Sequence, residues 1–390
     1  MNKSKTDLEE FGQYNFGNYL WIYGSPILIV VGTFGNFISI LVLLRPKLRC
    51  STTMFYLTCL SFGDLFTLYT GLLRYWIRRA FDVDVRHLSD ASCKIHTFLV
   101  YVSLDFTVWV LVSVTVDRCL SVSIPFKAKL LCSLKRSFCV IGAIFLFLVL
   151  KNMHFFWNLG LVNTWEFRCD GKSEAAESFL RYIWPWIDFS TFCLIPFAIM
   201  IACNIKIIFE MISSQRKLDR HNNFYRTSRK SDSPLTNEDH SDMAIQSMTM
   251  QDTTPTNEVT PQSRINTNVA RDITANVTTD VTIKRQSPVR RISSLTAMLL
   301  TVNCVFLITT SPIQAFLIGE EYWFPDKTQE QIAWYNFWWA VVNMLQYINN
   351  AIHFFLYCLT GPRFRNELKS IFLRNHKIAV IKQKSGETEL

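Results

Sequence analysis

Charged residues are scarce in this chain of 390 amino acids. Asp, Glu, Lys and Arg together make up only 18% of the sequence, whereas hydrophobic residues make up 49% and aromatic residues 14%. Soluble domains of ordinary composition carry about 25% charged residues. The first nineteen residues are polar and mixed in charge, so no cleavable signal peptide is visible. The composition therefore argues against a soluble domain, and the first apolar segment is expected to remain as a membrane anchor.

Features that indicate an enzyme or a transporter are also missing from the sequence. The histidines His96, His154 and His353 are dispersed along the chain, without the spacing of a metal site. Neither half of the chain resembles the other, and no apolar segment is interrupted by glycines, as is common in transporters. We therefore expect no catalytic activity and no cofactor. The net charge of +9 does not call for a nucleic-acid partner, because the basic residues gather at the ends of the apolar segments.

Seven apolar stretches are long enough to cross roughly 30 Å of hydrocarbon. They lie near residues 20–44, 54–77, 94–122, 137–158, 180–210, 294–318 and 332–358. No strand signal and no internal repeat is visible. The sequence therefore predicts an all-α membrane protein, a bundle of seven transmembrane helices that forms one domain over residues 20–358.

Lys and Arg near the ends of the stretches predict which side of the membrane each loop faces. If the stretches alternate in direction, one side receives Arg45, Lys47, Arg49, Lys127, Lys129, Lys135, Arg136, Lys284, Arg285, Arg290, Arg291, Arg363, Arg365 and Lys369. This side is expected to be cytoplasmic, which leaves the N-terminal segment 1–19 outside the cell. Segment 212–289 is rich in Ser, Thr, Asn and Asp, and is predicted to be a disordered cytoplasmic loop. Its hydroxyl groups are either kinase targets or part of a plain solvated linker.

The cysteines are odd in number, eleven, so they are not all paired with one another. Most lie within the stretches or on the expected cytoplasmic side, where thiols stay reduced. Only Cys93 and Cys169 are predicted to lie outside the cell. A disulfide between them would tie the loop after the fourth stretch over the mouth of the bundle.

Several motifs resemble those of rhodopsin-family (class A) G-protein-coupled receptors. Asp117 and Arg118 end the third stretch, 24 residues after Cys93 in the case of Asp117, which is the family's spacing. Other matches lie at Asn36, Asp64, Pro125, Pro196, Pro312 and Tyr357. Residues 361–390 begin with a short amphipathic helix, of the kind that the family lays along the membrane lipid, followed by a cytoplasmic tail. The resemblance covers the chain except its long loop and its tails.

The resemblance implies a signalling role for these residues. Arg118 is held by Asp117 at rest and is freed to meet a heterotrimeric G protein when the sixth helix moves outward, and Tyr357 belongs to the same machinery. Pro196 and Pro312 bend their helices; the bend at Pro312 is either a hinge or only shapes the bundle.

The resemblance also implies an ion site in the middle of the membrane. There the carboxylate of Asp64 would bind sodium together with Asn36, Asn349 and the hydroxyl of Thr107. The alternative is a protonated, hydrogen-bonded Asp64 without any ion.

Other positions depart from the family pattern. Thr310 stands where the family has a switch Trp, His353 and Phe354 replace its Asn-Pro pair, and Asn204 replaces a Tyr. Segment 349–361, which contains the histidine, resembles invertebrate FMRFamide-type neuropeptide receptors. A receptor-like protein that binds ligand with weak or no G-protein coupling is the alternative reading.

Further absences narrow the class of ligand. Val100 stands where amine receptors carry an Asp, and the seventh stretch has no Lys for retinal, so monoamine binding and light sensing are disfavoured. A short amidated neuropeptide is favoured, with a non-peptide small molecule as the alternative. The expected cavity is aromatic with a few polar groups. Its predicted lining is Trp76, Tyr101, Asp105, Asp188, Gln314, Trp339, Asn343 and Gln346.

The charged groups near this cavity allow two interpretations each. Asp105 and Asp188 either face an Arg of the peptide or only satisfy hydrogen bonds between helices. Arg74, Arg78 and Arg79 either receive an acidic ligand or extend toward the membrane surface.

The chain ends in a motif that resembles ligands of PDZ domains. Such ligands need an apolar residue at the free carboxyl end and a hydroxyl two residues earlier, here Leu390 and Thr388. The sequence as a whole predicts a multi-pass receptor of the plasma membrane, with an extracellular peptide, a G protein and, at the tail, a PDZ-domain protein as partners.

Overall fold

A computed structural model describes residues 7–163, 167–231, 288–324 and 328–371. By its internal contacts the chain forms two units. The first, Met1–Ser213 with Ile292–Leu390, contains the helical bundle. The second, Ser214–Arg291, is described only where α12 ends and α14 begins.

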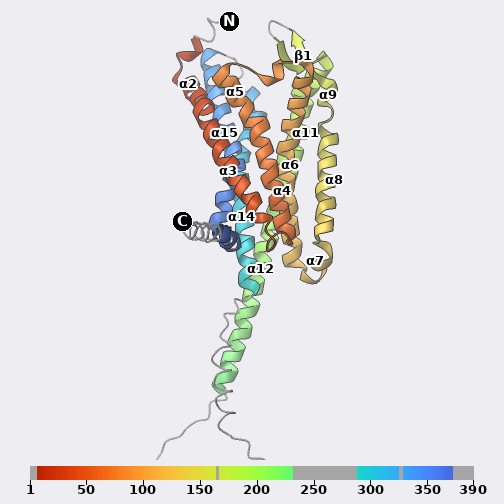
Figure 1. Cartoon of the computed structure of the whole chain (residues 1–390), viewed down its shortest axis with the longest axis vertical. Coiled ribbons are helices and arrows are strands. Elements are labelled where there is room, and N and C mark those ends of the chain that lie inside the picture. Colours follow the sequence, from red (N-terminus) through yellow and green to blue (C-terminus); the bar gives the residue numbers. More distant parts are fainter. Residues whose placement is uncertain (1–6, 164–166, 232–287, 325–327, 372–390) are drawn as a thin grey trace, which may run out of the picture. The chain divides into compact units, whose positions relative to one another are not determined.

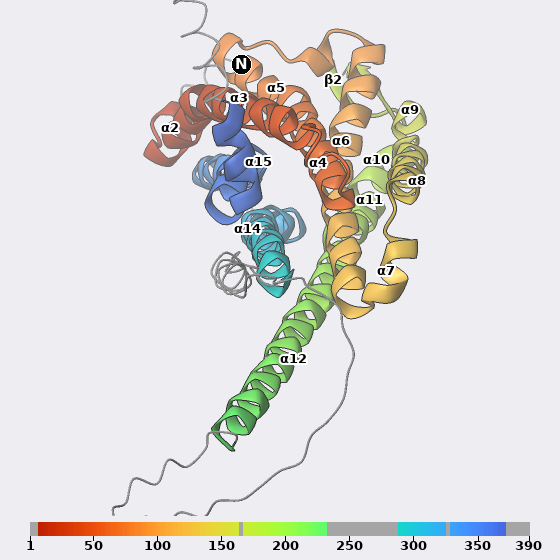
Figure 2. The same cartoon turned by 60° about the horizontal axis from the view of Figure 1, so that its bottom comes forward.

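The bundle is built from long helices, several of which contain a π-helical turn. In chain order its elements are α2 (Gly12–Tyr19), η1 (Leu20–Gly24), α3 (Ser25–Leu43), α4 (Thr52–Thr67), η2 (Leu68–Leu72), α5 (Leu73–Phe81), η3 (Val85–His87), α6 (Asp90–Ser123), α7 (Pro125–Leu131), α8 (Leu134–Asn152), α9 (Phe155–Asn158), β1 (Leu159–Asn163), β2 (Phe167–Gly171), α10 (Glu174–Ser178), η4 (Phe179–Ile183), α11 (Trp184–Asp188), η5 (Phe189–Leu194), α12 (Ile195–Ser231), α14 (Pro288–Trp323) and α15 (Gln329–Thr360). Helices α3, α4, α6, α14 and α15 surround a common centre (Figures 1 and 2).

The predicted bundle of helices is confirmed, but its boundaries differ from those read in the sequence. The first helix begins at Gly12 rather than near residue 20, and α12 continues to Ser231, into the segment expected to be a loop. Within the residues that the structure describes, five helices are both long and apolar enough to cross a membrane. The second and seventh predicted spans (α4–η2–α5 and α15) are long but more polar, and α15 turns buried amide side chains such as Asn343 and Asn349 inward.

The outer surface of the bundle carries large apolar side chains, as a protein surrounded by lipid requires. Phe34, Phe62 and Phe138 are each more than half exposed (63%, 56% and 61%). The centre of the bundle, by contrast, holds buried polar residues among its aliphatic core. This inverted distribution positions the polar network described below.

The expectation that the chain has no strands is wrong. Strands β1 and β2 form an antiparallel pair in which Leu161 faces Cys169. Each strand has only five residues, too few for a periodic pattern to be visible in the sequence. The predicted disulfide between Cys93 and Cys169 is confirmed, with Cα atoms 5.4 Å apart, and it fastens β2 to the start of α6.

At the opposite end of the bundle, residues 362–371 form the predicted short helix. Its buried Phe364 contacts Tyr357 of α15, with ring centroids 5.7 Å apart. On the other side Glu367 accepts ion pairs of 3.3 Å from both Arg45 and Lys47. The apolar face is therefore packed on the bundle and the charged face is tied to the turn after α3.

Candidate functional site

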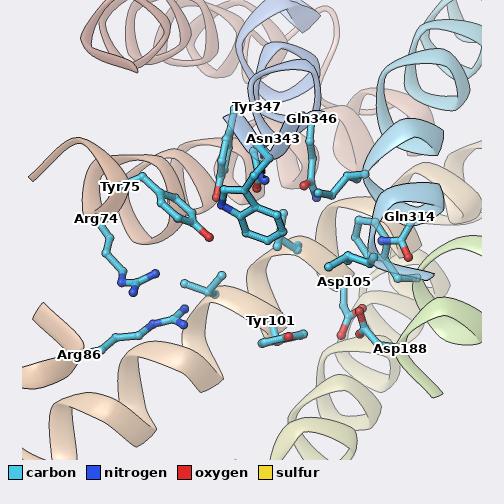
Figure 3. Close-up of a pocket in the computed structure, with 17 residues that line it drawn as sticks. Arg74, Tyr75, Arg86, Tyr101, Asp105, Asp188, Gln314, Asn343, Gln346 and Tyr347 are labelled. Atoms are coloured by element: carbon cyan, nitrogen blue, oxygen red, sulfur yellow. Dashed lines mark hydrogen bonds between the residues drawn. The ribbon is translucent and has the colours of Figure 1, made fainter. Parts of the chain in front are cut away.

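A cavity of about 270 Å³ lies in the bundle, near the end that carries the disulfide. Of the eight residues predicted to line it, seven do so: Tyr101, Asp105, Asp188, Gln314, Trp339, Asn343 and Gln346. They come from α6, α11, α14 and α15 (Figure 3). Seven of the eight predicted positions therefore meet at one cavity.

Trp76 does not line the cavity, contrary to expectation, and Tyr75 takes its place. The indole Nε1 of Trp76 instead donates to the carbonyl oxygen of Ile22 at 3.2 Å. The π-helical turn η2 precedes these residues and fits one more residue into its turn, which rotates the rest of the helix. A pattern based on regular α-helical spacing cannot anticipate this rotation.

One side of the cavity is acidic, and its two carboxylates share a buried lysine. Lys151 Nζ lies 2.9 Å from Asp105 Oδ2 and 2.8 Å from Asp188 Oδ1. The amide of Asn152 donates to the same Asp105 oxygen at 3.0 Å. The side chains of Lys151 and Asp105 are 6% and 1% exposed. These three charged groups together carry one net negative charge, and both carboxylates are bonded between helices, which is one of the two interpretations that the sequence allowed.

The other side of the cavity is basic, and its groups include one that the sequence analysis did not select. Arg74 forms two hydrogen bonds to Asp84, of 2.8 and 2.5 Å. Arg86 lines the cavity, and its guanidinium donates to His96 Nδ1 at 3.1 Å while its backbone N–H donates to Asp84 Oδ1 at 3.0 Å. Its guanidinium forms no ion pair within the described part of the chain. Figure 3 shows Arg74 and Arg86 side by side, across the cavity from Asp105 and Asp188.

The electrostatics of this basic side follow from the close packing of its charges. Burial disfavours the ionised form of Asp84, but the hydrogen bonds and charge of Arg74 outweigh it and hold the pKa of that carboxyl well below its usual range. Burial, helped by the charge of Arg74, lowers the pKa of Arg86 to about 10. Arg86 therefore remains charged at neutral pH. The charge of Asp84 favours this, but the guanidinium has no ion-pair partner of its own in the described part of the chain.

The remaining basic candidates point away from the cavity. Arg79 donates to the side-chain oxygens of Asn18 and Asn336, so it joins α2, α5 and α15. Arg78 is about half exposed and lies 3.6 Å from Asp84. Of the three arginines considered for an acidic ligand, only Arg74 reaches the cavity.

The mid-bundle network around Asp64 differs from the one that the resemblance implied. Asp64 is bonded to Asn350 Nδ2 at 2.8 Å and to His353 Nδ1 at 2.6 Å. Asn36 donates to the backbone oxygen of Asn350 at 2.8 Å, and Thr107 donates to the carbonyl of Leu104. Neither Asn349 nor Thr107 has a hydrogen bond to Asp64 among the described residues.

At the far end of the bundle, Asp117 and Arg118 are not joined to each other. Asp117 is buried and accepts a hydrogen bond of 2.9 Å from the hydroxyl of Thr52. The described ion pairs include none between Asp117 and Arg118, and the buried Nε of Arg118 has no hydrogen-bond partner in that part of the chain. Tyr357, near the end of α15, is fully buried and packs against Phe364 of the short helix.

A second polar contact between helices involves one of the departures from the family pattern. The amide of Asn303 in α14 donates to Thr115 of α6 and to Asn204 of α12, at 3.0 Å in each case. We call Thr115, Asn204 and Asn303 the amide clasp. The two predicted hinge residues lie in the same helices: Pro196 in the first turn of α12 and Pro312 within α14. Thr388 and Leu390 lie outside the described residues.

Comparison with known proteins completes this picture. The profile of the seven-transmembrane receptors of the rhodopsin family matches residues 35–357. The chain belongs to this family. Its members are receptors, and the chain is accordingly a multi-pass membrane protein.

Individual relatives are distant and differ in their ligands. Cysteinyl leukotriene receptor 1 of Cavia porcellus is 25% identical over 215 residues, which cover 52% of this chain and 60% of the relative. The FMRFamide peptide receptor frpr-18 of Caenorhabditis elegans is 24% identical over 200 residues, 47% of this chain and 45% of the relative. C-C chemokine receptor type 1 of Homo sapiens is 30% identical over 117 residues, 30% of this chain and 32% of the relative. The chain thus spans about a third to 60% of the length of these relatives.

Proposed function

We propose that this chain is a plasma-membrane receptor, N-terminus outside, that binds a short extracellular peptide and activates a heterotrimeric G protein. The observation that supports a peptide is the charge distribution of the cavity. Arg74, Arg78 and Arg86 share the single carboxylate of Asp84 and leave a net positive charge on one side. Asp105, Asp188 and Lys151 leave one negative charge on the other. A ligand with one acidic and one basic group matches both sides, and peptides commonly carry both.

The same charge distribution indicates which chemical group of the ligand binds on each side of the cavity. Lys151 compensates one of the two carboxylates, so the acidic side suits a single basic group such as an Arg or an amino terminus. Arg86 presents an unpaired guanidinium, which suits a carboxylate. In an amidated peptide this carboxylate belongs to an acidic side chain. The relative named as an FMRFamide peptide receptor supports the peptide class.

A non-peptide acid is the second candidate, and Arg86 is the observation that favours it. A ligand with an acidic group and an apolar body would use Arg86 and the aromatic wall of Tyr75, Tyr101 and Trp339. Such a ligand would leave the acidic side without a partner, which is why the peptide is preferred. Relatives named as leukotriene receptors keep this candidate open.

The G protein is proposed as a partner from the family resemblance, and a PDZ-domain protein from the last residues of the sequence. Arg118 and Tyr357 contact or support the G protein, segment 212–289 is a cytoplasmic loop, and the short helix after α15 rests on lipid. The tail residues Thr388 and Leu390 bind a PDZ domain.

A peptide screen on cells that express the chain tests the proposed function. Each peptide of an amidated neuropeptide panel is also made as the free acid, and simple fatty acids form a third set; calcium and cyclic-AMP reporters give the response. We expect a peptide with both an acidic and a basic group to activate the receptor. Activation by fatty acids alone would select the second candidate.

Variants then separate binding from coupling. Arg118→Ala should abolish the response but leave peptide binding, while Lys135→Ala, an exposed basic residue of the same end, should change neither. Arg86→Gln should weaken the active ligand about tenfold or more, because a charge-assisted hydrogen bond contributes about 1.5–3 kcal/mol. Its matched control is Arg78→Gln, outside the cavity. Full signalling by Arg118→Ala would refute the coupling role.

A further inference from the structure

The buried carboxylate of Asp64 has a partner that the family resemblance did not suggest. Asp64 is 0% exposed and lies in α4, in the middle of the bundle. A carboxylate in such a place requires a compensating group. Among the described residues that group is His353 of α15, whose Nδ1 lies 2.6 Å from Oδ2. We infer that the His353 ring takes the place of a sodium ion, so that this receptor binds no sodium in its core.

The first argument concerns the oxygens of Asp64 itself. Oδ1 accepts from the amide of Asn350 at 2.8 Å, and Oδ2 shares the short hydrogen bond with His353. Both oxygens are thus approached by the hydrogen-bonding nitrogens of neighbouring side chains. A sodium ion placed against the carboxylate would face the positive ends of these donors, in addition to losing the space that the ring fills.

The second argument concerns the other ligands that sodium would need. Hard cations require several oxygen ligands that converge on one point. The hydroxyl of Thr107 donates to the carbonyl of Leu104 at 2.8 Å, and the side-chain NH2 group of Asn36 donates to the backbone oxygen of Asn350. The amide oxygens of Asn36 and Asn349 have no hydrogen-bond partner in the described part of the chain, but neither they nor Thr107 are bonded to Asp64, whose two oxygens are taken by Asn350 and His353. The residues present therefore do not fit a sodium site.

The third argument concerns how firmly the ring is held. His353 is fully buried and lies parallel to Tyr357, with an angle of 8° between the rings and 6.1 Å between their centroids. Tyr357 in turn packs on Phe364 of the short helix. The hydrogen bond between Asp64 and His353 thus joins α4 to α15. A sodium ion bound to Asp64 could dissociate, whereas the His353 ring is covalently attached to α15 and cannot.

Thermal unfolding of the purified, ligand-free receptor tests the inference, and no knowledge of the ligand is needed. Melting temperatures are compared in sodium chloride and in choline chloride at equal ionic strength, so that screening is the same in both. For the unmodified chain we expect the two values to agree within about 1 °C. His353→Asn, which frees one oxygen of Asp64 and adds an amide oxygen, should gain a sodium-specific rise of about 2 °C or more.

Two further variants make the outcome unambiguous. His87→Asn carries the same substitution in the loop between α5 and α6 and should stay indifferent to sodium. Asp64→Asn removes the carboxylate in the unmodified background. A sodium-specific stabilisation of the unmodified receptor that Asp64→Asn abolishes would overturn the inference, even if His353→Asn did not fold. A folded His353→Asn without a sodium response would equally refute the role of the ring. Both results are independent of which ligand the receptor binds.

Discussion

Replacing Lys151 by Met should destabilise the receptor strongly, because two buried carboxylates then lose their shared cation. The ammonium lies 2.9 and 2.8 Å from the oxygens of Asp105 and Asp188, and its side chain is only 6% exposed. At an effective dielectric constant of about 20, each contact corresponds to ~6 kcal/mol of gross attraction. Most of this offsets the cost of removing the charges from water. Removal of one partner of such a buried pair costs about 3–5 kcal/mol.

The assay is thermal unfolding of detergent-purified protein together with the amount of receptor at the cell surface. A loss of this size should lower the melting temperature by roughly 5 °C or more. The matched control is Lys94→Met, which removes a lysine that is paired with Asp90 at the exposed start of α6 and should leave the melting temperature unchanged.

A compensating variant tests the electrostatic cause directly. Neutralising both carboxylates, by Asp105→Asn and Asp188→Asn in the Lys151→Met background, should recover most of the lost stability, because no buried charge then remains without a partner. If Lys151→Met were as stable as the unmodified chain, or if the triple variant showed no recovery, the assignment of Lys151 as the shared cation would be wrong.

Three other outcomes follow from the structure. Cys169→Ser should cost up to about 4 kcal/mol, since the disulfide closes a loop of 76 residues, and should abolish ligand binding, while Cys50→Ser should do neither. Asn303→Ala opens the amide clasp and should raise ligand-independent signalling in reporter cells; unchanged basal activity would show that the clasp does not restrain α14. The pKa of Asp84 is lower in the folded chain than its ordinary value, so its contribution to stability is complete above about pH 4 and is lost as the pH falls further. Melting temperatures measured down through this range should fall for the unmodified chain and fall less for Asp84→Asn.

The order of apolar and polar residues was sufficient to predict the helical architecture, because a lipid environment imposes strong and local rules. Stretches of apolar residues must be helices that satisfy their own backbone hydrogen bonds, and their number and length can be counted directly. The disulfide was predicted because Cys93 and Cys169 alone were expected outside the cell, and seven of the eight residues that were assigned to a cavity after the family resemblance do line one.

Which charged side chains meet depends on how the helices pack against one another. Lys151 is an ordinary lysine near the end of a stretch until α6, α8 and α11 bring it between Asp105 and Asp188. In the sequence His353 is only a departure from the family pattern. The packing of α15 on α4 brings its ring to the carboxylate of Asp64.

Local backbone geometry decided the remaining differences. The π-helical turn η2 exchanges Trp76 for Tyr75 at the cavity, although the sequence pattern of that helix is regular. Arg86 reaches the cavity from the loop after α5, where no periodic rule places side chains. Periodicity along one helix fixes which face a residue occupies, whereas partners across helices depend on how several helices rotate and pack. The fold could therefore be predicted from the sequence, whereas the pairing of the charged groups at the cavity became visible only in the packed bundle.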